Sequence, residues 1–294
     1  MLFTGTGVAI VTPFNHDRTI DFDALRRIVS HCIDGQIDYI VALGSTGEAA
    51  TLNTNEKADV IRYVVETVAG RVQVVVGVGG NDTVKTVDDI RHTNFDGVSG
   101  LLSVTPSYNK PAQAGLIEHF KAVADASPVP VILYNVPSRT GVNMTAETTL
   151  TLAHEVDTIV AVKEASGNLF QIMQIINNRP DNFSVISGDD AISLSLMAVG
   201  GHGVISVAAN AFPREMTTII RSSMDNKFAK AKTVHYAMLD LFDALSVEGN
   251  PSGIKAALSI LGLSQNVLRL PLIPVSQKMY EKMETLIKKL EIRN

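Results

Sequence analysis

The chain has 294 residues, of which 46% are hydrophobic, and this is enough for one large domain or two small ones. Its formal net charge is −5 and no block of basic residues occurs, so a nucleic-acid partner is not expected. A single cysteine, Cys32, excludes an internal disulfide and fits a reducing compartment.

The first residues of the chain lack the cationic start of a signal peptide and soon give way to charged residues. No stretch approaches the roughly 18 uncharged apolar residues that a membrane-spanning helix requires. We therefore expect a soluble, cytoplasmic protein that does not contact a membrane.

Short apolar runs rich in β-branched residues alternate with amphipathic segments, a pattern typical of buried strands between helices. The runs predicted as strands span residues 7–14, 39–44, 72–79, 97–105, 131–136, 159–163, 184–188 and 204–208. Strands that are apolar on both faces and alternate with helices indicate a parallel sheet covered by helices. Eight such units favour an α/β fold of the (β/α)₈ TIM barrel type, which needs about 250 residues.

An open, doubly wound sheet is the competing architecture. It would carry a glycine-rich phosphate-binding turn after its first strand, but Thr12-Pro13-Phe14-Asn15 stands there. The closed barrel is therefore preferred.

Capping signals mark the expected helices. Asp21 can begin a helix whose apolar residues follow a period of 3.6, and Gly35 can end it. Asn53, with Glu56 three residues later, resembles a capping box at the start of a second helix.

The strand pattern stops at about residue 225. Three helices are predicted after it, over residues 228–245, 254–261 and 275–290. No linker rich in glycine, serine or proline divides the chain. We therefore predict a barrel over residues 1–224 and, over residues 225–294, an appended C-terminal helical bundle packed on it.

Lys163 ends the apolar run Ile159-Val160-Ala161-Val162 and is followed by a turn that contains Gly167. An ammonium group at the end of a buried strand loses hydration, which favours its neutral form. Lysines of this kind form Schiff bases with carbonyl compounds. The alternative is a lysine that reaches solvent or pairs with an acid.

In a (β/α)₈ barrel the active site lies at the carboxyl ends of the strands. Several polar side chains are expected to meet there with Lys163: Ser45, Thr46, Glu48, Ser107, Tyr108, Tyr134, Arg139, Asp189 and Asp190. The seven histidines are scattered without ligand spacing, so a metal-dependent aldolase is not expected. Asp189 and Asp190 are interpreted as partners of a helix dipole rather than as cation ligands.

No recognisable glycine-rich phosphate turn follows the seventh or the eighth predicted strand. The substrate is therefore expected to be a carboxylate rather than a phosphate ester. Arg139 is the candidate for a bidentate clamp on that carboxylate.

Three segments resemble motifs of a known family: residues 44–48 (Gly-Ser-Thr-Gly-Glu), residues 134–141 (Tyr-Asn-Val-Pro-Ser-Arg-Thr-Gly) and residues 162–165 (Val-Lys-Glu-Ala). The family is that of the pyruvate-dependent class I aldolases, which includes 4-hydroxy-tetrahydrodipicolinate synthase and N-acetylneuraminate lyase. The resemblance runs from about residue 3 to residue 290. The Ser-Arg-Thr-Gly ending of the second motif favours the synthase branch over the lyase.

The resemblance implies a Schiff-base condensation of pyruvate with L-aspartate 4-semialdehyde, in the biosynthesis of diaminopimelate and lysine. Lys163 would form the imine with pyruvate, and no cofactor beyond this covalent imine is implied. Tyr134 would give and take protons beside the imine. Thr46 would link Tyr134 by hydrogen bonds to Tyr108, which the neighbouring subunit of a tight dimer would contribute.

The same resemblance assigns the substrate contacts. Arg139 would hold the carboxylate of the semialdehyde, and Ser45 stands where many relatives carry threonine. Backbone groups of Gly188 and Ile205 would flank the pyruvate pocket. The family suggests a homotetramer built as a dimer of tight dimers.

Many relatives are inhibited by lysine at the dimer interface. The matching positions hold Asn81, Ala49, Thr54, Lys57, Lys85 and Ser107. Feedback-sensitive members tend to carry histidines, a glutamate and a second tyrosine at the last four of these positions. Two cations would repel a dibasic ligand, so we expect weak or absent inhibition by lysine.

Two other functions stay open. Another pyruvate-dependent aldolase or lyase, such as a 2-keto-acid aldolase or N-acetylneuraminate lyase, would use the same scaffold with a different second substrate. A catalytically silent barrel that senses keto acids would be expected to have lost Lys163 or Tyr134, and both are present.

Overall fold

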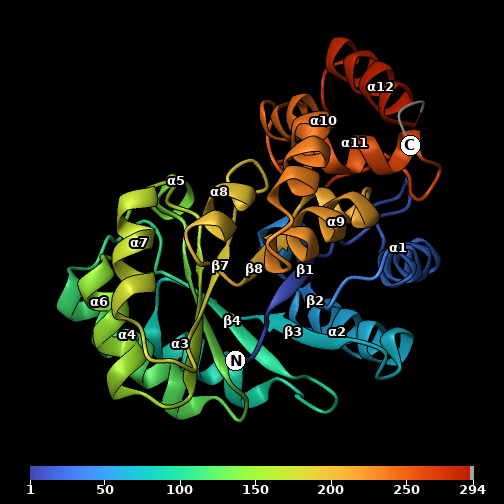
Figure 1. The fold of residues 1–294 in the computed structure, drawn as a ribbon. Coiled ribbons are helices and arrows are strands. Elements are labelled where there is room, and N and C mark those ends of the chain that lie inside the picture. The colour runs from blue at the N-terminus through green and yellow to red at the C-terminus, as the bar shows by residue number, and fades with distance from the viewer. Residues whose placement is uncertain (292–294) are drawn as a thin grey trace.

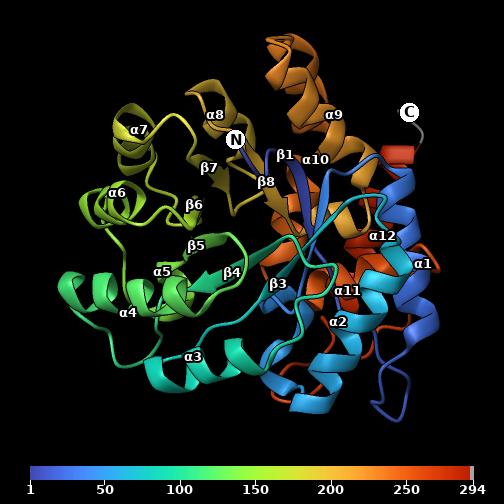
Figure 2. The ribbon, with the colours of Figure 1, turned by 90° about the horizontal axis from the view of Figure 1, so that it is seen from below.

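A computed structural model of the chain describes residues 1–291 and, within them, a closed barrel of parallel strands ringed by helices (Figures 1 and 2). Each strand pairs with the next in the sequence, and β8 pairs with β1 to close the barrel. The strands are β1 (Gly5–Ala9), β2 (Tyr39–Ala42), β3 (Gln73–Gly77), β4 (Gly100–Val104), β5 (Val131–Asn135), β6 (Ile159–Glu164), β7 (Ser184–Ser187) and β8 (Gly203–Ser206).

The predicted (β/α)₈ barrel is therefore confirmed, and each predicted strand overlaps an observed one. The first was predicted too long, because β1 ends at Ala9 rather than at residue 14. The backbone N–H of Val11 donates to the side chain of Asn210 instead of to a strand, at 3.0 Å. Pro13 has no N–H to donate, so the ladder cannot continue there.

The helices that cover the barrel lie outside the strands, as Figure 2 shows. They are α1 (Phe22–Asp34), α2 (Thr54–Val68), α3 (Thr83–His92), α4 (Gln113–Ala126), α5 (Pro137–Thr140), α6 (Ala146–Glu155), α7 (Leu169–Asn178), α8 (Ser193–Ala198) and α9 (Pro213–Met224). Three short 3₁₀ helices, η1 (Ser45–Gly47), η2 (Ala49–Thr51) and η3 (Ala208–Asn210), follow β2 and β8.

Both predicted helix starts are confirmed. The Asp21 side chain accepts a hydrogen bond from the backbone N–H of Ala24 at the start of α1. Asn53 and Glu56 form a complete capping box at the start of α2, with donor–acceptor distances of 3.0 and 2.9 Å. Each cap satisfies backbone donors that the first helical turn leaves free.

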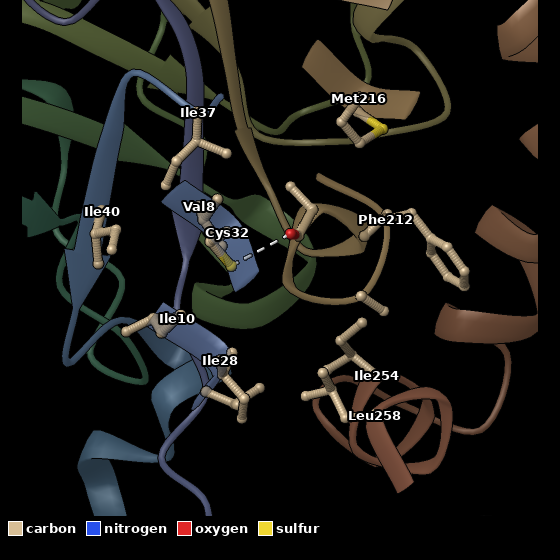
Figure 3. Close-up of a cluster of buried hydrophobic side chains, with 14 of the residues drawn as sticks. Val8, Ile10, Ile28, Cys32, Ile37, Ile40, Phe212, Met216, Ile254 and Leu258 are labelled. Atoms are coloured by element: carbon tan, nitrogen blue, oxygen red, sulfur yellow. Dashed lines mark hydrogen bonds between the residues drawn. The ribbon is translucent and has the colours of Figure 1, made fainter. Parts of the chain in front are cut away.

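The C-terminal segment forms α10 (Phe228–Ser246), α11 (Ser252–Ile260) and α12 (Gln277–Glu291), close to the predicted helices. They pack against one another and on α9 and η3 at one side of the barrel (Figure 1). Their buried side chains belong to the same hydrophobic cluster as residues of β1 and α1. Figure 3 shows Ile254 and Leu258 of α11 in that cluster together with Ile10, Ile28 and Cys32. The division at residue 224 stays a prediction, because one core runs across it.

Cys32 is fully buried and its thiol lies 3.5 Å from the carbonyl oxygen of Ala209. It is a small core residue, as its apolar surroundings in the sequence suggest. Among the helices of residues 1–291, none combines the length and the apolarity needed to cross a membrane.

A separate cluster of buried side chains fills the interior of the barrel. It contains Ala9, Tyr39, Val41, Val75, Leu102, Ile132, Tyr134, Ala161, Ile186 and Ile205. Because side chains alternate along a strand, Lys163 faces the same way as Ala161, toward this interior. Lys163 therefore reaches the carboxyl end of the barrel from inside.

Candidate active site

Lys163 and Tyr134 lie side by side inside the barrel. They are direct partners in the parallel pairing of β5 with β6. Lys163 is only 5% exposed, and its Nζ lies 4.2 Å from the centre of the Tyr134 ring. The register of two neighbouring strands thus brings an amine and a phenol together.

The surroundings of Lys163 favour its neutral form. Burial lowers the pKa of Lys163 to about 7; the carboxylate of Asp190 opposes this shift, and the guanidinium of Arg139 adds to it. No ion pair or hydrogen bond of its Nζ occurs within residues 1–291, so the alternative of a lysine paired with an acid or exposed to solvent is wrong. A large share of this amine is uncharged near neutral pH.

Tyr134 keeps its proton. The residue is 7% exposed, and burial raises the pKa of its phenol, while the positive charge of Arg139 acts in the opposite direction. A neutral phenol can both donate and accept a hydrogen bond. It can therefore exchange protons with a group bound at Lys163.

Gly188 and Ile205 lie around the same space. A Cβ at Gly188 would stand 2.7 Å from Cβ of Ala165 and 3.0 Å from Cε of Lys163, so only glycine leaves the amine undisturbed. Ile205 of β8 is fully buried in the interior cluster that also holds Tyr134.

Thr46 and Ser45 form the short helix η1 that follows β2. Thr46 is buried and Ser45 is exposed. The hydroxyl of Thr46 accepts a hydrogen bond from the side-chain amide of Asn250 at 3.0 Å. A residue of the C-terminal segment thus contacts the active-site loop.

Asn250 also contacts Arg139. Nη2 of Arg139, at the end of α5, donates to the carbonyl oxygen of Asn250 at 3.3 Å. Asn250 is not among the site residues expected from the sequence, because it lies 204 residues from Thr46 along the chain.

Tyr108 stands apart from the other hydroxyls. It is 88% exposed, and its φ of +72° is a conformation that few residues other than glycine adopt. Its backbone N–H donates to the carbonyl oxygen of Thr140 at 3.3 Å. None of the hydrogen bonds between residues 1–291 joins Tyr108, Thr46 and Tyr134, so one subunit alone does not form the expected relay.

A cavity of about 960 Å³ opens beside these residues and is lined by Tyr134, Arg139, Ser45 and Asn250. It extends outward between α2 and α3. Five positions expected to lie near the lysine site in relatives line this outer part: Ala49, Thr54, Lys57, Lys85 and Ser107. A small acid could enter from solvent and reach Tyr134 through this cavity.

Lys57, Arg62 and Lys85 line the outer part together with several acids, and Lys85 is paired. Nζ of Lys85 lies 3.0 Å from a carboxylate oxygen of Asp89 on the next turn of α3. The Asp89 carboxylate offsets the charge of Lys85, so Lys57 contributes more positive charge to the cavity than Lys85 does.

Comparisons with known proteins cover almost the whole chain. Residues 2–290 match the family model described as the dihydrodipicolinate synthetase family. A 4-hydroxy-tetrahydrodipicolinate synthase of Parabacteroides distasonis is 48% identical over 289 residues, which cover 98% of this chain and 97% of the relative.

Two solved structures show the same fold at similar coverage. The crystal structure of dihydrodipicolinate synthase from Aquifex aeolicus has a TM-score of 0.95 and 41% identity, and covers 98% of both chains. The enzyme from Cyanidioschyzon merolae, crystallised with lysine bound, has a TM-score of 0.95 and 38% identity, and covers 99% of both chains.

Proposed function

The chain belongs to the dihydrodipicolinate synthetase family, and we propose on this premise that it condenses pyruvate with L-aspartate 4-semialdehyde to give 4-hydroxy-tetrahydrodipicolinate. It is then a lyase of diaminopimelate and lysine biosynthesis. The observation that carries the proposal is the buried amine of Lys163, without an ion-pair partner in residues 1–291, held against the phenol of Tyr134.

Lys163 begins the reaction in this proposal. Its neutral Nζ attacks the ketone carbon of pyruvate, and loss of water leaves an iminium ion. A methyl proton then leaves. The electron pair of its C–H bond forms the enamine double bond, and the nitrogen takes up the electrons of the C=N bond. The lowered pKa of Lys163 supplies the free amine for the first step.

The enamine carbon next attacks the aldehyde carbon of the semialdehyde, and the aldehyde oxygen takes up a proton. The amino group of the same substrate attacks the imine carbon, closes the ring and expels the amine of Lys163. Each step moves a proton, so a phenol such as Tyr134 beside the imine is well suited to carry it.

Tyr134 exchanges these protons through Thr46 and a Tyr108 from the neighbouring subunit. The exposure of Tyr108 supports this assignment, because its ring is free to enter a second copy of the chain. Arg139 holds the carboxylate of the semialdehyde, as its place on the cavity wall allows. Ser45 and the backbone of Gly188 and Ile205 bind pyruvate.

The assembly is a homotetramer of two tight dimers in the cytoplasm. Exposed apolar side chains lie next to residues that line the cavity, Val84 beside Lys85 and Leu270 beside Pro271, and a partner subunit would cover them. A single buried cysteine that forms no disulfide fits this compartment.

A coupled assay tests the proposal. Purified protein should consume L-aspartate 4-semialdehyde only when pyruvate is present, and Lys163→Ala should abolish this consumption. Turnover of pyruvate with another aldehyde, but not with the semialdehyde, would favour a different aldolase of the same family. Substantial turnover by Lys163→Ala would reject the Schiff-base mechanism.

A further inference from the structure

The C-terminal helices reach the active site through an ion pair that the reaction scheme does not use. Glu48, which follows the Ser45-Thr46-Gly47 turn, pairs with Lys255 of α11. Neither side chain is exposed to solvent. Removing one partner of such a pair would leave an uncompensated buried charge, which is strongly unfavourable.

Further contacts hold both partners in place. Nζ of Lys255 donates to the carbonyl oxygen of Val267 at 3.0 Å and lies 4.1 Å from the centre of the Phe14 ring. The second carboxylate oxygen of Glu48 accepts from the backbone N–H of Arg269 at 3.1 Å. Burial lowers the pKa of Lys255, and the carboxylate of Glu48 opposes this shift, so each charge depends on its partner.

The pair fixes the backbone on both sides of the Asn250–Thr46 hydrogen bond. On one side, Glu48 has a left-handed backbone, with φ of +52°, at the junction of η1 and η2, two residues after Thr46. On the other, the backbone N–H of Lys255 donates to the carbonyl oxygen of Pro251, the residue after Asn250, at 3.0 Å. One ion pair thus ties the donor and the acceptor segments together.

In the hydrogen bond between Asn250 and Thr46, the donor and the acceptor are fixed by chemistry. The amide nitrogen of Asn250 can only donate, so the oxygen of Thr46 accepts and its single proton is free for another acceptor. We propose that Glu48 and Lys255 are positioning residues that hold Asn250 on Thr46, so that the Thr46 proton stays available to the proton relay of the proposed function. This inference rests on the proposed function, in which Thr46 and Tyr134 move protons.

Two measurements on pyruvate alone separate proton transfer from imine formation. Borohydride trapping reports the imine, and exchange of the pyruvate methyl protons in D₂O, followed by NMR, reports proton transfer. Asn250→Ala and Lys255→Met should trap pyruvate as the unaltered protein does but exchange its methyl protons at least about tenfold more slowly, because positioned proton transfer contributes about 10²–10⁴-fold.

Control variants sharpen the test. Lys282→Met removes an exposed ion pair with Asp243, 3.6 Å long, between α12 and α10, and should change neither measurement. Lys255→Arg keeps the cation and should restore much of the exchange lost in Lys255→Met. Asn250→Ala should add no further loss to Thr46→Val, because both remove the same hydrogen bond.

Exchange within about twofold of the unaltered rate in Asn250→Ala would overturn the proposal, given the size of positioned proton-transfer effects. An equal fall of trapping and exchange in Asn250→Ala would also overturn it, since the residue would then only maintain the site. If Lys255→Met does not fold, Glu48→Gln takes its place, because it removes the charge and keeps the shape of the side chain. Exchange within about twofold of the unaltered rate in either folded variant would overturn the role of the pair. Absence of trapping in the unaltered protein would reject the proposed function, and this inference with it.

Discussion

The amine of Lys163 owes its low pKa to burial more than to a neighbouring charge. Burial is the largest influence on its pKa, and the charges of Asp190 and Arg139 act in opposite directions. Asp190 is itself held by the backbone N–H groups of Val207 and Ala208, at 3.1 and 2.8 Å. In the proposed reaction, the barrel interior would thus provide a neutral nucleophile without a dedicated base.

The pH dependence of imine formation follows from this pKa. Below a pKa of about 7 the amine is mostly protonated, so the initial rate of borohydride-trapped imine formation should rise about tenfold per pH unit up to that value. Above it the amine is neutral and the rate should level off. A rate that still rises beyond about pH 9 would show an ordinary lysine pKa, near 10.4, and would contradict this account of the site.

Individual site residues differ in how far the sequence could predict them. Lys163 was identified because it ends a buried strand, which is a local pattern. Lys255 is also a lysine in an apolar helical segment, but its partner Glu48 comes from a distant loop. A side chain whose role depends on a partner far away in the sequence is not marked by any periodic pattern of residues.

At the level of elements, α10 and α11 pack unusually closely at Gly253. A Cβ at this position would meet the carbonyl oxygen of Leu245 and lie 2.6 Å from its carbonyl carbon. Backbone atoms cannot move aside as a flexible side chain can, so glycine permits this approach. The contact lies two residues before Lys255 on the same helix.

Gly253→Ala should therefore destabilise the protein by about 1–3 kcal/mol, as overpacking of a close contact does. Gly115→Ala in α4 is the matched control, because its nearest neighbour, Cβ of Pro111, would lie at an ordinary 3.4 Å. The control should be neutral or stabilising by up to about 1 kcal/mol, since alanine favours helix. Denaturant midpoints measure both changes, and equal midpoints would contradict the packing argument.

Helices and strands were predictable where a local pattern of apolar or capping residues marks them. The apolar runs located all eight strands, and the side chains of Asp21 and Asn53 marked two helix starts. The short helix η1 was not predicted, because Gly-Ser-Thr-Gly is equally compatible with an ordinary turn. Its shape depends on contacts with the distant Asn250 and Lys255.

For the whole molecule, the proposed role of the exposed Tyr108 would make the assembly part of the chemistry. In a two-fold symmetric dimer each subunit would complete the other's site. Lys163→Ala and Tyr108→Phe should each be nearly inactive alone. In a hybrid dimer, one site would contain both the intact lysine and the intact tyrosine.

Co-expression of the two variants should therefore restore about a quarter of the normal sites if subunits pair at random in two-fold dimers. The measurement is the coupled assay at equal total protein. The Tyr108→Phe variant expressed without Lys163→Ala provides the baseline activity. No recovery in verified hybrids would show that Tyr108 does not act in the partner's site.

Feedback by lysine, which the family resemblance places at the same interface, is expected to be weak in this chain. Lys57 and Lys85 line the outer cavity at positions expected to meet a dibasic ligand, and their charges oppose its binding. Asp59, Glu66, Asp89 and Asp96 line the same part of the cavity, so the expected repulsion is local to the two lysines. We predict that lysine inhibits weakly or not at all. An inhibition constant below about 1 mM, equivalent to roughly −4 kcal/mol, would contradict this prediction.

The sequence predicted the barrel and the position of its reactive end, because both follow from repeated local patterns. It could not predict how the C-terminal helices share the core with β1 and α1. That arrangement depends on the shapes of many side chains at once, such as the contact between Gly253 and Leu245.

The central claim is that Lys163 forms a covalent imine with pyruvate. Reduction of the protein with borohydride in the presence of pyruvate, followed by peptide mass mapping, tests it most directly. We predict one reduced pyruvate adduct on the peptide that contains Lys163, and none in Lys163→Ala. An adduct on another lysine, such as Lys255, or no adduct at all, would contradict the proposed mechanism.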